Sequence, residues 1–135
     1  MPLLKWSKKY SVGVKAFDEQ HIVLVDSLNI LHAAMLKGDA QSVAGELLPI
    51  MIEKASNHFS TEERLMENTK FPGLAEHSGE HRALIAKAAE FVARYNQGDQ
   101  AMYPQYLRFL GNWLHEHMLT VDKQYTKWMN EHGVH

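Results

Sequence analysis

Residues 58–81 read HFSTEERLMENTKFPGLAEHSGEH, a stretch that predicts two helices joined by a tight turn. His58 and Glu62 are four residues apart, and so are His77 and His81. Residues four apart in an α-helix share one face and lie one turn apart, so each pair can meet a common metal ion. The intervening FPG favours the end of one helix and the start of the next.

Helical periodicity continues outward from this stretch over most of the chain. Turn signals such as Gly38-Asp39 and Gly98-Asp99 separate four periodic stretches, and no segment alternates with the period of a strand. Long helices joined by short loops favour an all-α fold, an antiparallel up-down-up-down four-helix bundle. The expected helices span about 18–37, 40–68, 74–96 and 103–130, with Asp18 as the expected N-cap of the first.

Length and composition suit one domain with a buried core. The chain has 135 residues, of which 45% are hydrophobic, so there is no room for a second core of normal size. Residues 1–17 contain too many apolar side chains for a free tail. We therefore expect residues 1–135 to form a single domain in which residues 1–17 are an ordered N-terminal arm lying along the bundle.

Charge and cysteine content exclude several classes of function. The net charge is −2 with neutral histidines, which gives no electrostatic footprint for nucleic acid or an anionic membrane. No apolar run approaches the ~18 residues of a membrane span, and no signal peptide begins the chain, so we expect a cytoplasmic protein without membrane insertion. The chain has no cysteine, so any metal must be held by nitrogen and oxygen atoms.

Histidine is the unusual residue type, with nine in the chain. A single pair four residues apart is more often an ordinary core or surface feature, but here each expected helix carries a histidine and two carry a carboxylate. Imidazole and carboxylate ligands suit iron, manganese or zinc, and glutamate and histidine on facing helices of a bundle can hold a di-iron pair. A structural zinc ion needs four ligands. The candidates here outnumber that need and would serve two ions.

Helix geometry leaves open which histidine of the fourth helix is a ligand. His115 and Asp122 are seven apart and share a face of an ideal helix, whereas His117 and Asp122 are five apart and do not. A π-type turn between Leu119 and Asp122 would bring His117 into line, and such turns are common at functional sites. Side-chain reach could also bring His117 and Asp122 together.

The complete set resembles the hemerythrin family, specifically its single-domain bacterial branch, the bacteriohemerythrins. The resemblance covers nearly the whole chain. It rests on Ser11-Val12-Gly13-Val14, Phe17-Asp18-Glu19-Gln20-His21, His58-Phe59, Glu62-Glu63, Met66, His77, His81, Trp113-Leu114, His117 and Asp122.

The resemblance implies a cofactor of two iron ions (Fe2+/Fe3+) with a bridging oxo or hydroxo group. One iron would be held by His77, His81 and His117, the other by His21 and His58, and Glu62 and Asp122 would bridge both. It therefore selects His117 and leaves His115 outside the ligand set. With these ligands, the iron held by three histidines would have all its coordination positions filled. The iron held by His21 and His58 would have one ligand fewer and so an open position, where a small ligand can bind.

An apolar oxygen pocket beside the open iron is also implied by the resemblance. It would be lined by Leu24, Phe59, Trp113, Leu114 and Met118, with Leu114 as the gate, and Tyr125 would support the ligands. Ordinary bundle packing would explain most of these side chains without any ligand. His32 is expected to be a core or rim histidine with a hydrogen-bond partner away from the metals.

The function that we expect is reversible dioxygen binding by a monomer, without catalysis. It would serve oxygen storage, transport or delivery to an oxygen-consuming enzyme. Two alternatives stay open: an oxygen or redox sensor acting through a separate partner, and a di-iron peroxidase-like enzyme. Five histidines against two carboxylates argue against an oxygen-activating oxidase, because ferritin-like oxidases use more carboxylates.

Overall fold

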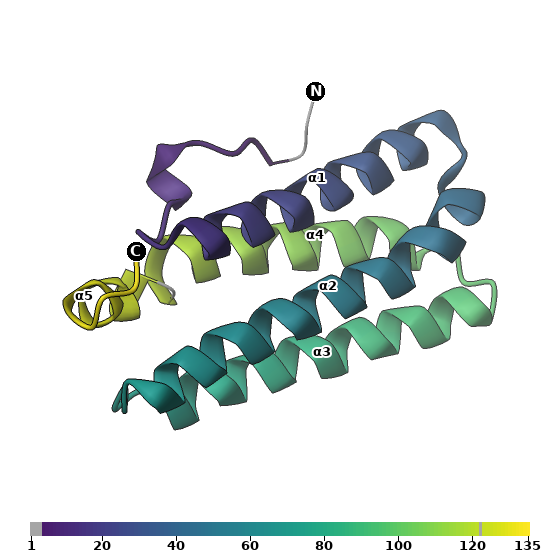
Figure 1. The fold of residues 1–135 in the computed structure, drawn as a ribbon. Coiled ribbons are helices and arrows are strands. Elements are labelled where there is room, and N and C mark those ends of the chain that lie inside the picture. Colours follow the sequence, from purple (N-terminus) through teal and green to yellow (C-terminus); the bar gives the residue numbers. More distant parts are fainter. Residues whose placement is uncertain (1–3, 122) are drawn as a thin grey trace.

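The computed structural model describes residues 4–121 and 123–135, and within them it contains helices and no strand. Four helical rods form a ring in which α1 packs on α2 and α4, and α3 packs on the same two neighbours. Figure 1 shows the rods side by side with consecutive rods running in opposite directions, as the sequence predicted. The rods are α1 (Lys15–Lys37), α2 (Ala40–Asn68), α3 (Leu74–Asn96) and the series α4 (Met102–Glu116), π-helix η2 (His117–Val121) and α5 (Lys123–Glu131).

The turn between α1 and α2 shows why the rods are antiparallel. Gly38 adopts a left-handed conformation with φ of 81°, which glycine reaches without strain. Its N–H and that of Asp39 donate to the last carbonyls of α1, and Asp39 N–H reaches Ala34 O at 2.8 Å. Because α1 ends and α2 begins within two residues, the chain must reverse direction there.

The start of α1 differs from the prediction. Val14 precedes the helix and Asp18 lies in its first turn, so the expectation that Asp18 is the N-cap was wrong. Its carboxylate instead accepts hydrogen bonds from the Ser11 hydroxyl at 2.6 Å and the Val12 N–H at 2.9 Å. The side chain therefore satisfies donors of the preceding arm and not those of the helix.

The described part of the N-terminal arm, residues 4–14, precedes α1 and includes the short 3-10 helix η1 (Lys8–Tyr10). Figure 1 shows this arm lying along α1. The side chain of Asn29 exchanges two hydrogen bonds with the backbone of Leu4, at 3.0 and 2.7 Å. The hydroxyl of Tyr10 is hydrogen-bonded to Nδ1 of His115 at 2.8 Å. These contacts fix the arm to α1 and α4.

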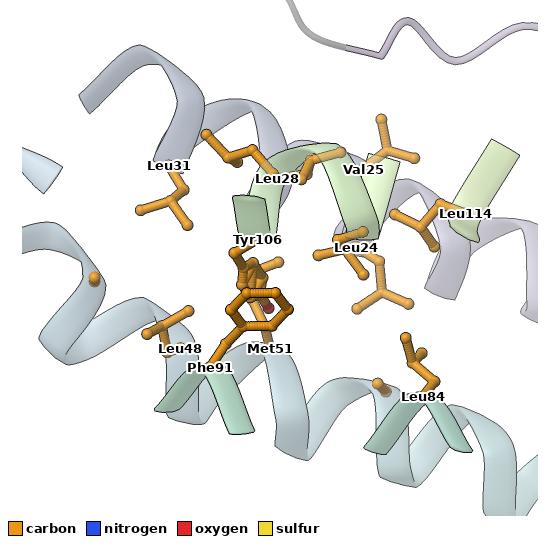
Figure 2. Close-up of a cluster of buried hydrophobic side chains, with 14 of the residues drawn as sticks. Leu24, Val25, Leu28, Leu31, Leu48, Met51, Leu84, Phe91, Tyr106 and Leu114 are labelled. Carbon is orange, nitrogen blue, oxygen red and sulfur yellow. The ribbon is translucent and has the colours of Figure 1, made fainter. Parts of the chain in front are cut away.

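Two apolar clusters occupy the interior. The larger one fills the ring and includes Leu28 and Leu31 of α1, both fully buried (Figure 2). The smaller one includes Phe17 and Tyr125 and lies near α5. His21 is one turn from Phe17 on α1 and lies between the two clusters, so any polar group there is shielded from water. Among the described residues no helix is both long and apolar enough to cross a membrane.

Candidate metal centre

Six of the seven predicted ligands gather in one buried cluster between the apolar regions. None of the six is more than 4% exposed, and Glu62 has no exposed surface. Each rod contributes, because the cluster comprises His21 of α1, His58 and Glu62 of α2, His77 and His81 of α3, and His117 at the start of η2. The seventh, Asp122, lies outside the described residues.

Glu62 lies at the centre, and its two oxygens face different histidines. Oε1 contacts Nε2 of His58 and lies 3.8 Å from Nε2 of His21. Oε2 lies 2.9 Å from Nε2 of His77 and 3.7 Å from Nε2 of His81. A carboxylate that presents one oxygen to each of two groups of imidazoles has the arrangement of a bridging ligand.

The donor atoms fall into two sets that share Glu62. His77, His81 and His117 form the three-histidine set, and His21 and His58 form the two-histidine set. Within each set, one donor atom from every residue and one Glu62 oxygen lie within 4.8 Å of one another. Each set has the size of a site for a single ion, so the cluster can hold two ions side by side.

The electrostatics of the cluster favour an ionised Glu62 and a neutral His81, the protonation states in which these two side chains can bind a metal. Burial by itself raises the pKa of Glu62, but the charge of His58 and hydrogen bonds from the surrounding histidines hold that pKa well below its usual value. Burial lowers the pKa of His81 to about 4, against the attraction of Glu62. At neutral pH the carboxylate is therefore ionised and the imidazole of His81 is neutral, with a lone pair available.

Hydrogen bonds within the cluster do not satisfy all of its buried polar atoms, whereas bound metal ions would. Nε2 of His81 is buried, lies 3.7 Å from Oε2 of Glu62 and has no hydrogen bond to the described residues. Buried polar atoms seldom lack a partner, since each such atom costs about 1–3 kcal/mol. Nitrogen and oxygen donors without thiolate suit iron, and two ions would satisfy both sets.

The π-helix η2 bears on the ambiguity of the fourth rod. It spans His117–Val121 and so overlaps the segment between Leu119 and Asp122 in which a π-type turn was expected. Backbone hydrogen bonds in a π-helix join residues five apart, so positions at that spacing follow one another along one face. Asp122 itself lies outside the described residues, so its pairing with His117 stays a prediction. His115 is half-buried, lies outside both metal sets and binds Tyr10 of the arm.

Aromatic side chains surround the three-histidine set. Phe59 stacks on His81, with ring centroids 3.8 Å apart and planes 7° from parallel. Trp113 stacks on His117 at 4.1 Å and 16°. Tyr125 meets His77 edge-on at 5.2 Å. Phe59 and Trp113 were predicted to line a pocket beside the two-histidine set, but both stack on the three-histidine set. The Phe59 ring also lies 5.8 Å from that of His58 in the two-histidine set.

The other predicted pocket residues, Leu24, Leu114 and Met118, are buried in the large apolar cluster. Figure 2 shows Leu24, Leu114 and Leu84 converging from α1, α4 and α3. These three leucines line part of an apolar cavity of about 20 Å³. A cavity of this size accommodates a single small molecule, and apolar walls of this kind tend to stay dry.

Two neighbours of the cluster were not assigned a role from the sequence. Gln20 places Oε1 against Nδ1 of His58, and Glu63 places Oε2 at 3.2 Å from Nδ1 of His81. Their position directly beside a ligand in the sequence was the available signal. His32 lies outside both metal sets, and its buried Nδ1 has no hydrogen bond to the described residues, so the expected partner of that atom is not found.

The chain is similar to proteins of a family named for cation binding, as the histidine and carboxylate cluster would suggest. The family described as hemerythrin HHE cation binding domain matches residues 12–129. A bacteriohemerythrin of Stenotrophomonas maltophilia is 30% identical over 132 residues, covering 98% of this chain and 85% of that protein. One of Methylococcus capsulatus is 29% identical over 126 residues, covering 93% and 95%.

Solved structures show the same arrangement of helices. A crystal structure of wild-type hemerythrin is 28% identical to this chain, with a TM-score of 0.82, and covers 93% of this chain and 96% of its own. A leucine-to-alanine mutant of hemerythrin is also 28% identical, with a TM-score of 0.84 and coverage of 94% and 97%.

Proposed function

Since the chain belongs to the hemerythrin family, we propose that it holds two iron ions in this cluster and binds dioxygen reversibly. The observation that carries the proposal is the position of Glu62. Its two oxygens face separate sets of histidines, with the shortest contacts to His58 on one side and His77 on the other. A single-ion site has no need of such a division.

The proposed ligands follow the two sets. His77, His81 and His117 hold one iron, His21 and His58 hold the other, and Glu62 bridges them. Asp122 is proposed as the second carboxylate bridge on the family resemblance, together with an oxo or hydroxo group. The chemistry that a bound iron pair supplies is the reversible transfer of two electrons to dioxygen.

The two metal sets contain different numbers of histidines, and this difference determines which ion a small ligand could reach. The two-histidine set provides one ligand fewer than the three-histidine set. With both bridges shared equally, an ion held by the two-histidine set would have one protein ligand fewer and would leave room for a small ligand, which a working metal site needs. Phe17 meets His58 edge-on at 5.5 Å, so this side of the cluster is also enclosed by an apolar ring.

The apolar lining has the role of excluding water and protons. Leu24, Phe59, Leu114 and Met118 are each 5% exposed or less, and Trp113 covers the face of His117. A dry surrounding limits proton access, and protons would promote the loss of dioxygen in reduced form. We propose that Leu114 is the residue of this lining that gates the open position.

The proposed role is to store dioxygen, transport it or deliver it to an oxygen-consuming enzyme. We propose that the protein does this as a monomer. The histidine-rich donor set favours binding over oxygen activation. A sensor that acts through a separate partner would share the binding step and differ in having a partner whose affinity changes with oxygen. A peroxidase-like enzyme would turn over peroxide with a reducing substrate.

The test is a reversible oxygen titration. The chain is loaded with Fe2+ without air, oxygen is added, the visible spectrum is recorded, and the oxygen pressure is then lowered. The proposal expects an absorption band that appears with oxygen and disappears on its removal, and a Glu62→Gln variant without such a band. Prompt conversion to a stable ferric protein with release of hydrogen peroxide would overturn reversible binding.

A further inference from the structure

The two sets of histidines differ in what lies behind them. Nδ1 of His81, in the three-histidine set, is 3.2 Å from the carboxylate of Glu63. Nδ1 of His58, in the two-histidine set, lies against the side-chain amide oxygen of Gln20. The three-histidine set therefore has an anionic acceptor at the Nδ1 of one of its histidines, and the two-histidine set has a neutral acceptor at the corresponding atom of His58.

Glu63 is held in place by a chain of hydrogen bonds between α2 and α3. The Ser78 hydroxyl donates to Oε1 of Glu63, and Nη1 of Arg82 donates to the Ser78 oxygen at 3.0 Å. With Oε1 occupied in this way, Oε2 is directed at His81. The Glu63 side chain is 30% exposed, so its charge costs less desolvation than that of the fully buried Glu62.

Stacking on Phe59 fixes the plane of the His81 ring. It does not fix how the ring is rotated within that plane. Phe59 lies parallel to it at 3.8 Å and restricts tilting. Stacking does not choose between the two ring nitrogens. An acceptor at Nδ1 does, because it requires the proton there and leaves the lone pair on Nε2, which faces Glu62.

We propose that Glu63 is a positioning residue that accepts a hydrogen bond from Nδ1–H of His81 and makes the three-histidine set the tighter of the two metal sites. A carboxylate behind a metal-bound histidine orients the ring and increases its basicity more than a neutral amide does. This inference rests on the proposed function, since it requires that both sets bind a metal.

The test measures the two Fe2+ affinities separately, without air, by competition with a chelator of known affinity. The variants are Glu63→Ala, which removes the acceptor, Glu63→Gln, which keeps an acceptor without the charge, and Ser78→Ala, which releases Oε1. Glu67→Gln is the matched control, because Glu67 lies one turn further along α2 and is exposed. Thermal unfolding of the metal-free proteins is recorded beside the affinities.

We expect two Fe2+ ions per wild-type chain, with the tighter affinity weakened about 10- to 100-fold in Glu63→Ala. Glu63→Gln and Ser78→Ala are expected to lose less, the weaker affinity to stay unchanged in all variants, and Glu67→Gln to match wild type. A general loosening of the bundle would weaken both affinities together.

Unchanged affinities in Glu63→Ala, or an equal loss at both sites, would overturn the positioning role while two ions still bind to the wild type. If Glu63→Ala does not fold, Glu63→Gln and Ser78→Ala decide by the same comparison. A wild-type chain that fails to bind two ions would instead overturn the proposed function, and this inference with it.

Discussion

Replacing Leu114 with alanine is expected to leave the fold intact and to make the oxygenated protein lose its oxygen irreversibly. Leu114 is 1% exposed and lines the apolar cavity of about 20 Å³. The substitution removes three carbons and opens space on the order of one or two water molecules, at ~30 Å³ each. A buried Leu→Ala change costs about 2–5 kcal/mol of unfolding free energy, and the upper end applies where neighbours do not collapse.

A matched control separates the gate from the loss of stability. Leu31 is also fully buried, and Figure 2 shows it toward the opposite end of the drawn cluster from Leu114. Leu31→Ala should therefore cost a similar unfolding free energy without opening space near Leu114.

The assay follows the oxygenated band of each variant at constant oxygen pressure, beside urea unfolding of the same preparations. Leu114→Ala is expected to decay to the ferric form at least severalfold faster than wild type, and Leu31→Ala at close to the wild-type rate. Equal decay of the two variants would mean that loosening alone causes the effect. A wild-type decay rate in Leu114→Ala would show that this side chain is not the gate.

Three further predictions concern the ligands and the arm. His117→Ala should lose iron, measured as iron per chain, whereas His115→Ala should keep it; the opposite result would reverse the ligand assignment. The metal-free protein should lose stability as the pH falls from about 6.5 through about 4, because the pKa of His81 is lowered on folding and the unfolded chain takes up that proton first. The lowered pKa of Glu62 acts in the same direction, but only as the pH falls below its ordinary value of 4.5. Thermal unfolding that is independent of pH between about 6.5 and 4 would contradict the burial argument for His81. Tyr10→Phe should cost about 1 kcal/mol of unfolding free energy by removing the hydrogen bond to His115, with unchanged iron content.

Local patterns account for what the sequence predicted well. Helical periodicity and the turn signals depend on neighbouring residues, so the four rods could be predicted without knowledge of their packing. The spacing of His58 with Glu62 and of His77 with His81 fixes one face of each helix, and the structure brings these four side chains together.

Contacts between distant segments account for what the sequence did not predict. Asp18 has the residue type of an N-cap, but its partners belong to the arm, and that choice depends on tertiary packing. The role of Glu63 depends on the register of α2 against α3, which places Ser78 and His81 opposite it. Neither relationship leaves a periodic signal in one segment.

Whether Glu62 bridges two irons is tested most directly by the number of iron ions per chain and the distance between them. X-ray absorption of the anaerobically loaded, then oxidised protein reports both the ligand types and any neighbouring iron. We expect two irons per chain, each with a neighbouring iron within about 4 Å and with nitrogen and oxygen ligands. One iron per chain, or two irons without an iron neighbour, would show that Glu62 does not bridge a pair and would overturn the proposed di-iron centre.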